Sequence, residues 1–174
     1  MDELAIERAA VVGLSMGGGA ALDLAAAHPD RLWALVHVAG GVTGMPVSAY
    51  TEEQDERFDL GDLDEKMAID FEVWAPLGAD ERLRELWRAT PDARGDTGAR
   101  LRPPPEVVPE DVRVPTLVIT ARQDPPSVVD AQREAARRIP SAQLVEVDSD
   151  HYLTLREPER VTQLIRDFLV PLSG

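Results

Sequence analysis

The sequence predicts an α/β fold in which a parallel sheet of about four strands is flanked by helices. Short, nearly continuous apolar runs recur along the 174 residues, and helical patterns separate them. Continuous apolar strands are typical of a parallel sheet that is covered on both faces. Strands that alternate with helices imply right-handed crossover connections. Glycine or proline interrupts the pattern where an element should end.

The first part of this pattern covers residues 1–42. Residues 2–7 are predicted to be the end of a helix, and residues 8–13 a buried strand. A helix should follow over 16–28, with alanine and leucine recurring on one face, and Pro29 should end it. A second apolar strand is expected over 32–39, and the pair Gly40-Gly41 breaks it.

Residues 43–109 differ from the segments on either side. The segment is acidic at its start and carries helical patterns over 62–74 and 79–89, before a stretch rich in glycine, proline and arginine. This composition predicts a helical cap or lid followed by a linker. The acidic run is interpreted as a solvated helix face.

The sheet pattern returns in residues 110–174. Strands are expected over 114–120 and 143–147, a helix over 127–138 between them, and a final helix over 158–169. The chain therefore divides into a first core part, an inserted cap and a second core part.

The composition limits the classes of function. The net charge of −14 argues against nucleic acid and anionic membrane surfaces as partners. No apolar run approaches the roughly 18 residues of a membrane span, and no signal-peptide pattern opens the chain. The chain has no cysteine, and its three histidines are isolated from one another, so we expect no metal. Because it also has no phosphate-binding glycine loop, we expect no cofactor. These features together favour the cytoplasm.

The sequence Gly13-Leu14-Ser15-Met16-Gly17 lies between a predicted strand and a predicted helix. In that context Gly-x-Ser-x-Gly indicates a nucleophile elbow, which exposes the serine hydroxyl above the sheet. Gly13 and Gly17 are expected because a Cβ at either position would collide with the neighbouring strand or helix. The alternative is a plain turn from strand to helix.

A serine hydroxyl needs a base to remove its proton. His28 is predicted at a helix end, and His37 inside an apolar strand as a core residue with a satisfied ring nitrogen. His151 follows the last strand directly, and ligands and catalytic groups of parallel sheets gather at the carboxyl ends of strands. His151 is therefore the predicted base.

The imidazole needs a carboxylate that holds its tautomer. Asp124 follows the strand at 114–120 and lies between Ser15 and His151 in the chain, so it is the predicted acid. The alternative is an aspartate that caps a helix or stabilises a turn. Asp148 and Asp150 are nearer to His151 in sequence but are expected to point elsewhere, and Asp150 could tune the pKa of the base.

The order Ser, Asp, His at the ends of successive strands is the order of the α/β-hydrolases. Residues 4–172 resemble that superfamily through the segments 4–18, 114–124 and 151–169. The elbow Gly-Leu-Ser-Met-Gly-Gly is similar to that of enol-lactonase and cofactor-free haloperoxidase-like members. The resemblance implies a partial α/β-hydrolase fold with a helical cap insertion, and a serine hydrolase that cleaves a small ester-like substrate. Ester, lactone, carbon–carbon bond and perhydrolysis chemistry stay open alternatives, since the choice among them depends on the shape of the pocket.

The resemblance also implies roles for individual residues. Ser15 would attack the carbonyl, His151 would act as general base and then general acid, Asp124 would orient His151, and the Met16 N–H would donate to the oxyanion. Side chains of the cap are candidates for lining the substrate pocket, with packing between the cap helices and the sheet as the alternative; the candidates are Trp74, Leu77, Leu83 and Trp87.

Two features depart from the family pattern. Asp150 stands before the histidine, where the family usually has glycine. The strands that usually precede the elbow, and the His-Gly loop that supplies a second oxyanion donor, have no counterpart in this sequence. The strand at 8–13 should therefore form an open edge. This supports an alternative function, a truncated and catalytically impaired fragment that acts only as a folding or association module and self-associates through that edge.

Overall fold

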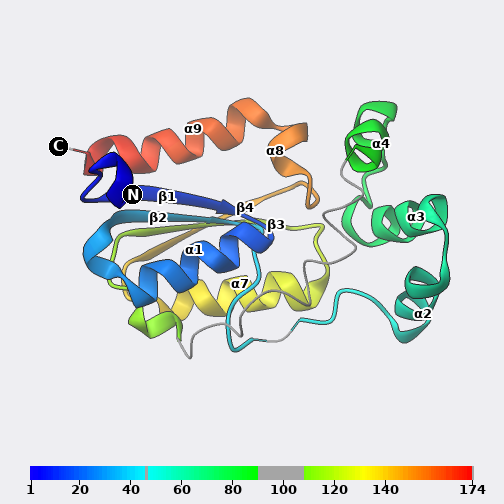
Figure 1. The fold of residues 1–174 in the computed structure, drawn as a ribbon, viewed down its shortest axis with the longest axis horizontal. Helices are drawn as coiled ribbons and strands as arrows, with labels where there is room; N and C mark the ends of the chain where they lie inside the picture. The colour runs from blue at the N-terminus through cyan, green and yellow to red at the C-terminus, as the bar shows by residue number, and fades with distance from the viewer. Residues whose placement is uncertain (46, 90–107, 174) are drawn as a thin grey trace.

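A computed structural model describes residues 1–45, 47–89 and 108–173. Within these residues, four parallel strands form one sheet in the order β1-β2-β3-β4 (Figure 1). The strands are β1 (Ala9–Leu14), β2 (Leu32–Val38), β3 (Thr116–Ala121) and β4 (Ala142–Val147). The predicted α/β class and the parallel sheet are confirmed.

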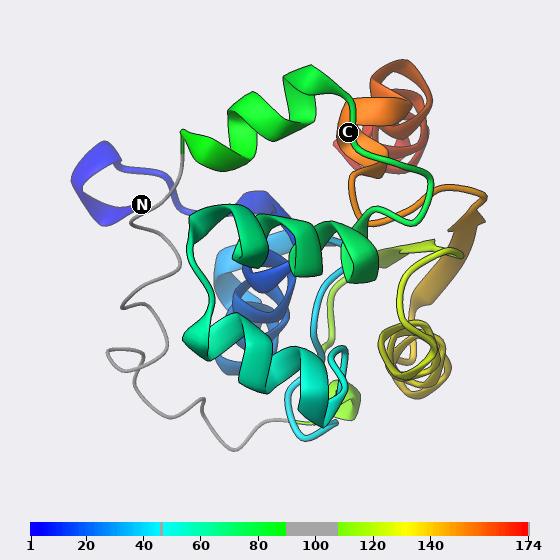
Figure 2. The same cartoon turned by 90° about the vertical axis from the view of Figure 1, so that its right-hand side faces the viewer.

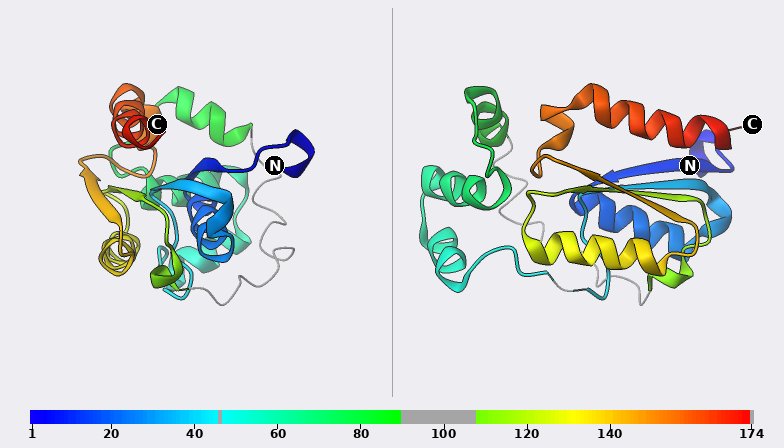
Figure 3. Two further views of the ribbon diagram at one scale, coloured as in Figure 1. Left: turned by 90° about the vertical axis from the view of Figure 1, so that its left-hand side faces the viewer. Right: turned by 180° about the vertical axis from the view of Figure 1, so that it is seen from behind.

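Helices cover both faces of the sheet (Figures 1 and 3). α1 (Met16–Ala27) and α7 (Pro126–Arg138) lie on one face, and α9 (Pro158–Leu169) lies on the other. One core cluster joins β2 and β3 to Val161 and Phe168 of α9, and a second joins β2 to Leu22 and Ala25 of α1. Because both faces are covered, the inner strands β2 and β3 are almost entirely buried, which explains their continuous apolar sequences.

The described part of the inserted segment contains three helices beyond the carboxyl ends of the strands, and we call them the cap helices (Figure 2). They are α2 (Glu52–Leu60), α3 (Leu63–Trp74) and α4 (Glu81–Arg88). Thr51, Asp62 and Asp80 each accept a hydrogen bond from an amide of the first turn, which fixes where the three helices begin.

The cap helices α3 and α4 match the helices predicted over 62–74 and 79–89. α2 was not predicted as a separate helix, since it buries no residue and shows no apolar face. A short helix after β4, α8 (Leu153–Arg156), was also not predicted. The linker predicted after residue 89 falls mostly outside the described residues.

Short 3₁₀ turns occupy Asp2–Leu4, Pro29–Arg31, Pro109–Asp111 and Val170–Leu172. The expected helix end over residues 2–7 is wrong: only Asp2–Leu4 is helical, because Ala5 adopts a left-handed conformation that ends the turn. β3 starts at Thr116, two residues after the predicted start, since Pro115 has no N–H for the ladder.

β1 lies at an edge of the sheet and pairs with β2 alone among the described strands. Val12 and Leu14 of this strand are 49% and 41% exposed. The predicted open edge is therefore present in the structure. Among the described residues, no helix has both the length and the hydropathy of a membrane span.

Candidate active site

Ser15 occupies the tight turn between β1 and α1, with φ 54° and ψ −123°. A positive φ is costly for a residue with a side chain, so the surrounding structure must hold it. The Ser15 N–H donates to the Val38 carbonyl of β2 at 2.9 Å, and the Ser15 carbonyl accepts from the Gly18 N–H at 2.8 Å. Ser15 is thus fixed from both sides in the strained geometry expected of an elbow.

Close packing explains the glycine at position 13. A Cβ there would lie 2.1 Å from the Gly17 carbonyl oxygen and 2.8 Å from the Ala21 Cβ. The reason predicted for Gly17 is wrong, because a Cβ at Gly17 would meet nothing within 4 Å. Gly17 lies on the exposed side of the first turn of α1, and Gly18 makes the close approach instead, where a Cβ would lie 3.0 Å from Gly40 Cα.

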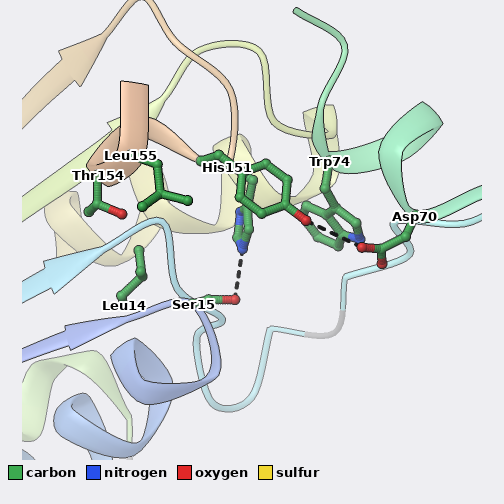
Figure 4. Close-up of a pocket in the computed structure, with 8 residues that line it drawn as sticks. Leu14, Ser15, Asp70, Trp74, His151, Thr154 and Leu155 are labelled. Carbon is green, nitrogen blue, oxygen red and sulfur yellow. Dashed lines mark hydrogen bonds between the residues drawn. The ribbon is translucent and has the colours of Figure 1, made fainter. Parts of the chain in front are cut away.

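The structure brings Ser15, His151 and Asp124 into one hydrogen-bonded chain. Figure 4 shows its link between His151 and Ser15. His151 Nε2 lies 2.8 Å from Ser15 Oγ, and His151 Nδ1 lies 3.1 Å from Asp124 Oδ2. With its proton on Nδ1, the imidazole donates to the carboxylate and leaves Nε2 free to accept from the serine hydroxyl. This is the arrangement that proton transfer from a serine requires.

The parallel sheet explains why these three residues meet. Ser15 follows β1, Asp124 follows β3 and His151 follows β4, so all three lie where the carboxyl ends of the parallel strands meet. The Arg122 and Gln123 amides donate to the carbonyls of Val147 and Ser149, at 2.9 and 3.0 Å. These bonds tie the turn that carries Asp124 to the loop that carries His151.

Asp124 is buried and does not cap a helix: α7 begins after Pro125 without a side-chain cap. Burial raises the pKa of the Asp124 carboxyl above its ordinary value, and the hydrogen bond with His151 opposes part of that rise. Of the alternative, the helix cap does not fit the structure, whereas Asp124 does lie in a turn, since its N–H donates to the Ala121 carbonyl at 3.2 Å.

The other two histidines have the positions expected of them. His37 is fully buried in β2, with Nε2 3.0 Å from the Gly41 carbonyl oxygen. Burial lowers its pKa and keeps it neutral. His28 is exposed at the end of α1. Within the described residues, no group of histidine, aspartate and glutamate gathers closely enough to hold a metal ion.

A pocket of about 500 Å³ opens beside Ser15 and His151 (Figure 4). Its wall on the cap side includes Trp74, whose ring centroid lies 4.5 Å from that of His151. The lining residues are Leu14, Ser15, Asp70, Trp74, His151, Tyr152, Thr154 and Leu155.

The structure places the other predicted pocket residues elsewhere. Leu77 is 51% exposed and does not line the pocket. Leu83 and Trp87 are buried in a cluster with Phe71 and Met67, because α4 turns its apolar face toward α3. Both side chains pack within the cap, so the alternative of packing between the cap helices and the sheet does not describe them either.

Asp70 is a buried carboxylate in the pocket wall that the sequence reading did not single out. Its Oδ1 accepts from the Tyr50 hydroxyl at 3.0 Å, and its Oδ2 accepts from Trp87 Nε1 at 2.9 Å and the Tyr152 hydroxyl at 3.3 Å. Trp74 Nε1 donates to the Tyr50 hydroxyl at 2.7 Å. Asp70 thus organises the aromatic wall around His151.

A signal for Asp70 was present in the sequence. Met67, Asp70, Phe71 and Trp74 follow the spacing i, i+3, i+4, i+7, which puts all four on one helix face. An aspartate on an otherwise apolar helix face predicts that hydrogen-bond donors surround its carboxylate, because buried polar groups are hydrogen-bonded.

The parallel sheet, the strained serine turn and the helical cap together define the α/β-hydrolase class. The chain belongs to the alpha/beta hydrolase family, whose sequence profile matches residues 1–164. It is 28% identical to a 2-hydroxymuconate semialdehyde hydrolase from Pseudomonas putida over 186 residues, which cover 97% of this chain and 65% of that enzyme.

Solved structures show the same fold. An enzyme that degrades N-acyl homoserine lactones is 24% identical, with a TM-score of 0.74 over 96% of this chain and 70% of the other. The enol-lactonase from Burkholderia xenovorans is 25% identical, with a TM-score of 0.69 over 98% of this chain and 68% of the other. The chain spans about 65% of the length of the curated relatives it matches.

Proposed function

We propose that this chain carries the nucleophile, base and acid of a serine hydrolase that cleaves a carboxylic ester or lactone. The observation that carries the proposal is the continuous hydrogen-bonded chain from Asp124 through His151 to Ser15, with links of 3.1 and 2.8 Å. It ends on a serine held at positive φ beside a pocket. Membership of a family whose named relatives are hydrolases supports the same reading.

In this reaction Ser15 Oγ attacks the substrate carbonyl while His151 Nε2 takes the hydroxyl proton. The Asp124 carboxylate stabilises the imidazolium that forms. Met16 begins α1, so its N–H belongs to the unpaired amides at the helix N-terminus and donates to the developing oxyanion. His151 then protonates the leaving oxygen, and a water molecule activated by His151 releases the acid from Ser15.

An ester or lactone suits this arrangement because the leaving group is an oxygen. His151 can deliver to that oxygen the same proton that it took from Ser15, and no further acid is needed. The hydrogen-bonded Ser15–His151–Asp124 chain therefore accounts for every proton transfer of ester hydrolysis.

Hydrolysis of aryl esters of graded acyl length tests this function. Replacing Ser15 with alanine removes the nucleophile, so the rate of phenol release should fall by about 10⁴-fold or more. The matched control is Ser173→Ala, which removes a hydroxyl from an exposed serine far along the chain and should leave the rate unchanged. Equal activity of the Ser15→Ala variant and the control would exclude Ser15 as the nucleophile.

A second candidate function is association through the edge of the sheet. Among the strands that the structure describes, β1 pairs with β2 alone, and it presents Val12 and Leu14 at the surface. Unpaired backbone groups of an exposed strand can add a further strand, and a second copy of this chain supplies one. In this proposal the chain acts as a folding and association module.

A further inference from the structure

Asp150, directly before His151, is a buried charged residue that the proposed chemistry does not use. It is 0% exposed, and the guanidinium of Arg156 contacts both of its oxygens. Arg156 Nε donates to Oδ1 and a terminal nitrogen donates to Oδ2, each at 2.7 Å. A two-point contact between a guanidinium and a carboxylate fixes the orientation of both groups.

The same pair reaches the cap. The Leu77 N–H donates to Asp150 Oδ2 at 3.3 Å, and the Arg156 guanidinium donates to the Gly78 carbonyl. Leu77 and Gly78 belong to the turn between α3 and α4, and Gly78 has φ +95°, a conformation that favours glycine. Asp150 and Arg156 therefore fasten this turn, residues 75–78, to the loop that follows β4.

Asp150 also holds the backbone on the other side of His151. The Tyr152 N–H donates to Asp150 Oδ1 at 3.1 Å, so one carboxylate bridges across the histidine. The 2.8 Å contact of His151 with Ser15 depends on the backbone that this carboxylate braces. A glycine at position 150 would provide none of these bonds.

We propose that Asp150 and Arg156 are positioning residues that tie the 75–78 turn of the cap to the loop carrying His151. This one ion pair determines both where the cap turn lies and how far His151 lies from Ser15. The kinetic consequence rests on the proposed function, whereas the structural tie does not.

The test uses Asp150→Asn, Arg156→Gln, Arg156→Lys and the double variant Asp150→Asn/Arg156→Gln. The control is Arg160→Gln. Arg160 pairs with Glu157 at 2.9 Å, and its side chain is 51% exposed. Two readouts are taken for each variant: kcat and KM on an aryl ester, and amide hydrogen exchange at Leu77 and Tyr152 followed by NMR.

If the tie positions His151, kcat should fall by about tenfold to a hundredfold, since small misplacements of a catalytic group are costly. KM should change by less than about twofold, because neither Asp150 nor Arg156 is among the residues that line the pocket. The double variant should lose no more than the worse single variant, and Arg156→Lys, which keeps the charge, should lose less than Arg156→Gln. Exchange at Leu77 and Tyr152 should accelerate together, and Arg160→Gln should match the parent protein.

Unchanged exchange at both amides, or kinetic losses that add in the double variant, would overturn the proposal. If the parent protein hydrolyses no ester, the proposed function fails, and the exchange rates at Leu77 and Tyr152 alone decide on the tie. If Asp150→Asn does not fold, the two Arg156 variants decide by the same criteria.

Discussion

At the scale of single residues, the site places opposing demands on Asp124. Burial raises the pKa of this carboxyl, so the ionised form that the proposed reaction needs is the form that the folded state disfavours. Because the raised pKa means that the folded protein binds the proton more tightly, this residue favours folding at low pH. That contribution is lost as the pH rises through the folded-state pKa.

Replacing Asp124 with asparagine should therefore stabilise the fold at neutral pH while lowering kcat by about 10⁴-fold, as loss of the correct tautomer does in serine hydrolases. Thermal unfolding at pH 7 and at pH 4 measures the first effect. The gain should shrink at the lower pH, where the parent carboxyl becomes protonated. A variant that is less stable than the parent protein at pH 7 would show that the hydrogen bond to His151 outweighs the cost of burial.

The sequence was sufficient to predict that Ser15, Asp124 and His151 lie close together, since each follows an apolar strand and parallel strands place their carboxyl ends on one side of the sheet. It did not reveal how Asp150 and Arg156 pair, because that contact depends on where the cap turn lies. The reason given for Gly17 failed similarly: which side of a helix faces the strand depends on the angle at which α1 leaves the elbow.

At the scale of elements, the apolar strands and α9 could be predicted because burial dictates their sequence pattern. The cap was harder to predict. α2 buries nothing, and the apolar face of α4 packs on α3 rather than on the sheet. The cap is held by this apolar cluster and by polar contacts, above all those of Asp70 with Tyr50, Trp87 and Tyr152.

Asp70→Ala should lower the free energy of unfolding by about 2–4 kcal/mol, because the buried donors lose their acceptor. Glu72→Ala on the same helix is exposed and should change it by less than about 0.5 kcal/mol. Denaturant unfolding of both variants measures the difference. Equal stability of the two would show that the aromatic packing of the cap, and not the Asp70 hydrogen bonds, holds α3 and α4 together.

At the scale of the whole molecule, the four-stranded sheet is covered on both faces but open along β1. The chain matches relatives that are about half as long again, and 65% of their length is represented here. Both candidate functions, hydrolysis and association, involve β1, since this strand forms the open edge and leads directly into Ser15. Pairing along β1 would also brace the elbow.

If the edge associates, the apparent mass in solution should rise with protein concentration. Val12→Lys places a charge on the exposed strand and should keep the chain monomeric. Leu60→Lys, which removes a more exposed leucine from the end of α2, should behave as the parent protein does. Light scattering coupled to size exclusion measures all three, and a parent protein that is monomeric at every concentration would rule out the association.

The reactivity of one hydroxyl tests the central claim most directly. After incubation with a fluorophosphonate, mass spectrometry of the digested protein should find the adduct on Ser15, and His151→Ala should slow its formation strongly because no base then takes the proton. An adduct on a different serine, or labelling at the same rate in the Ser15→Ala variant, would contradict the account.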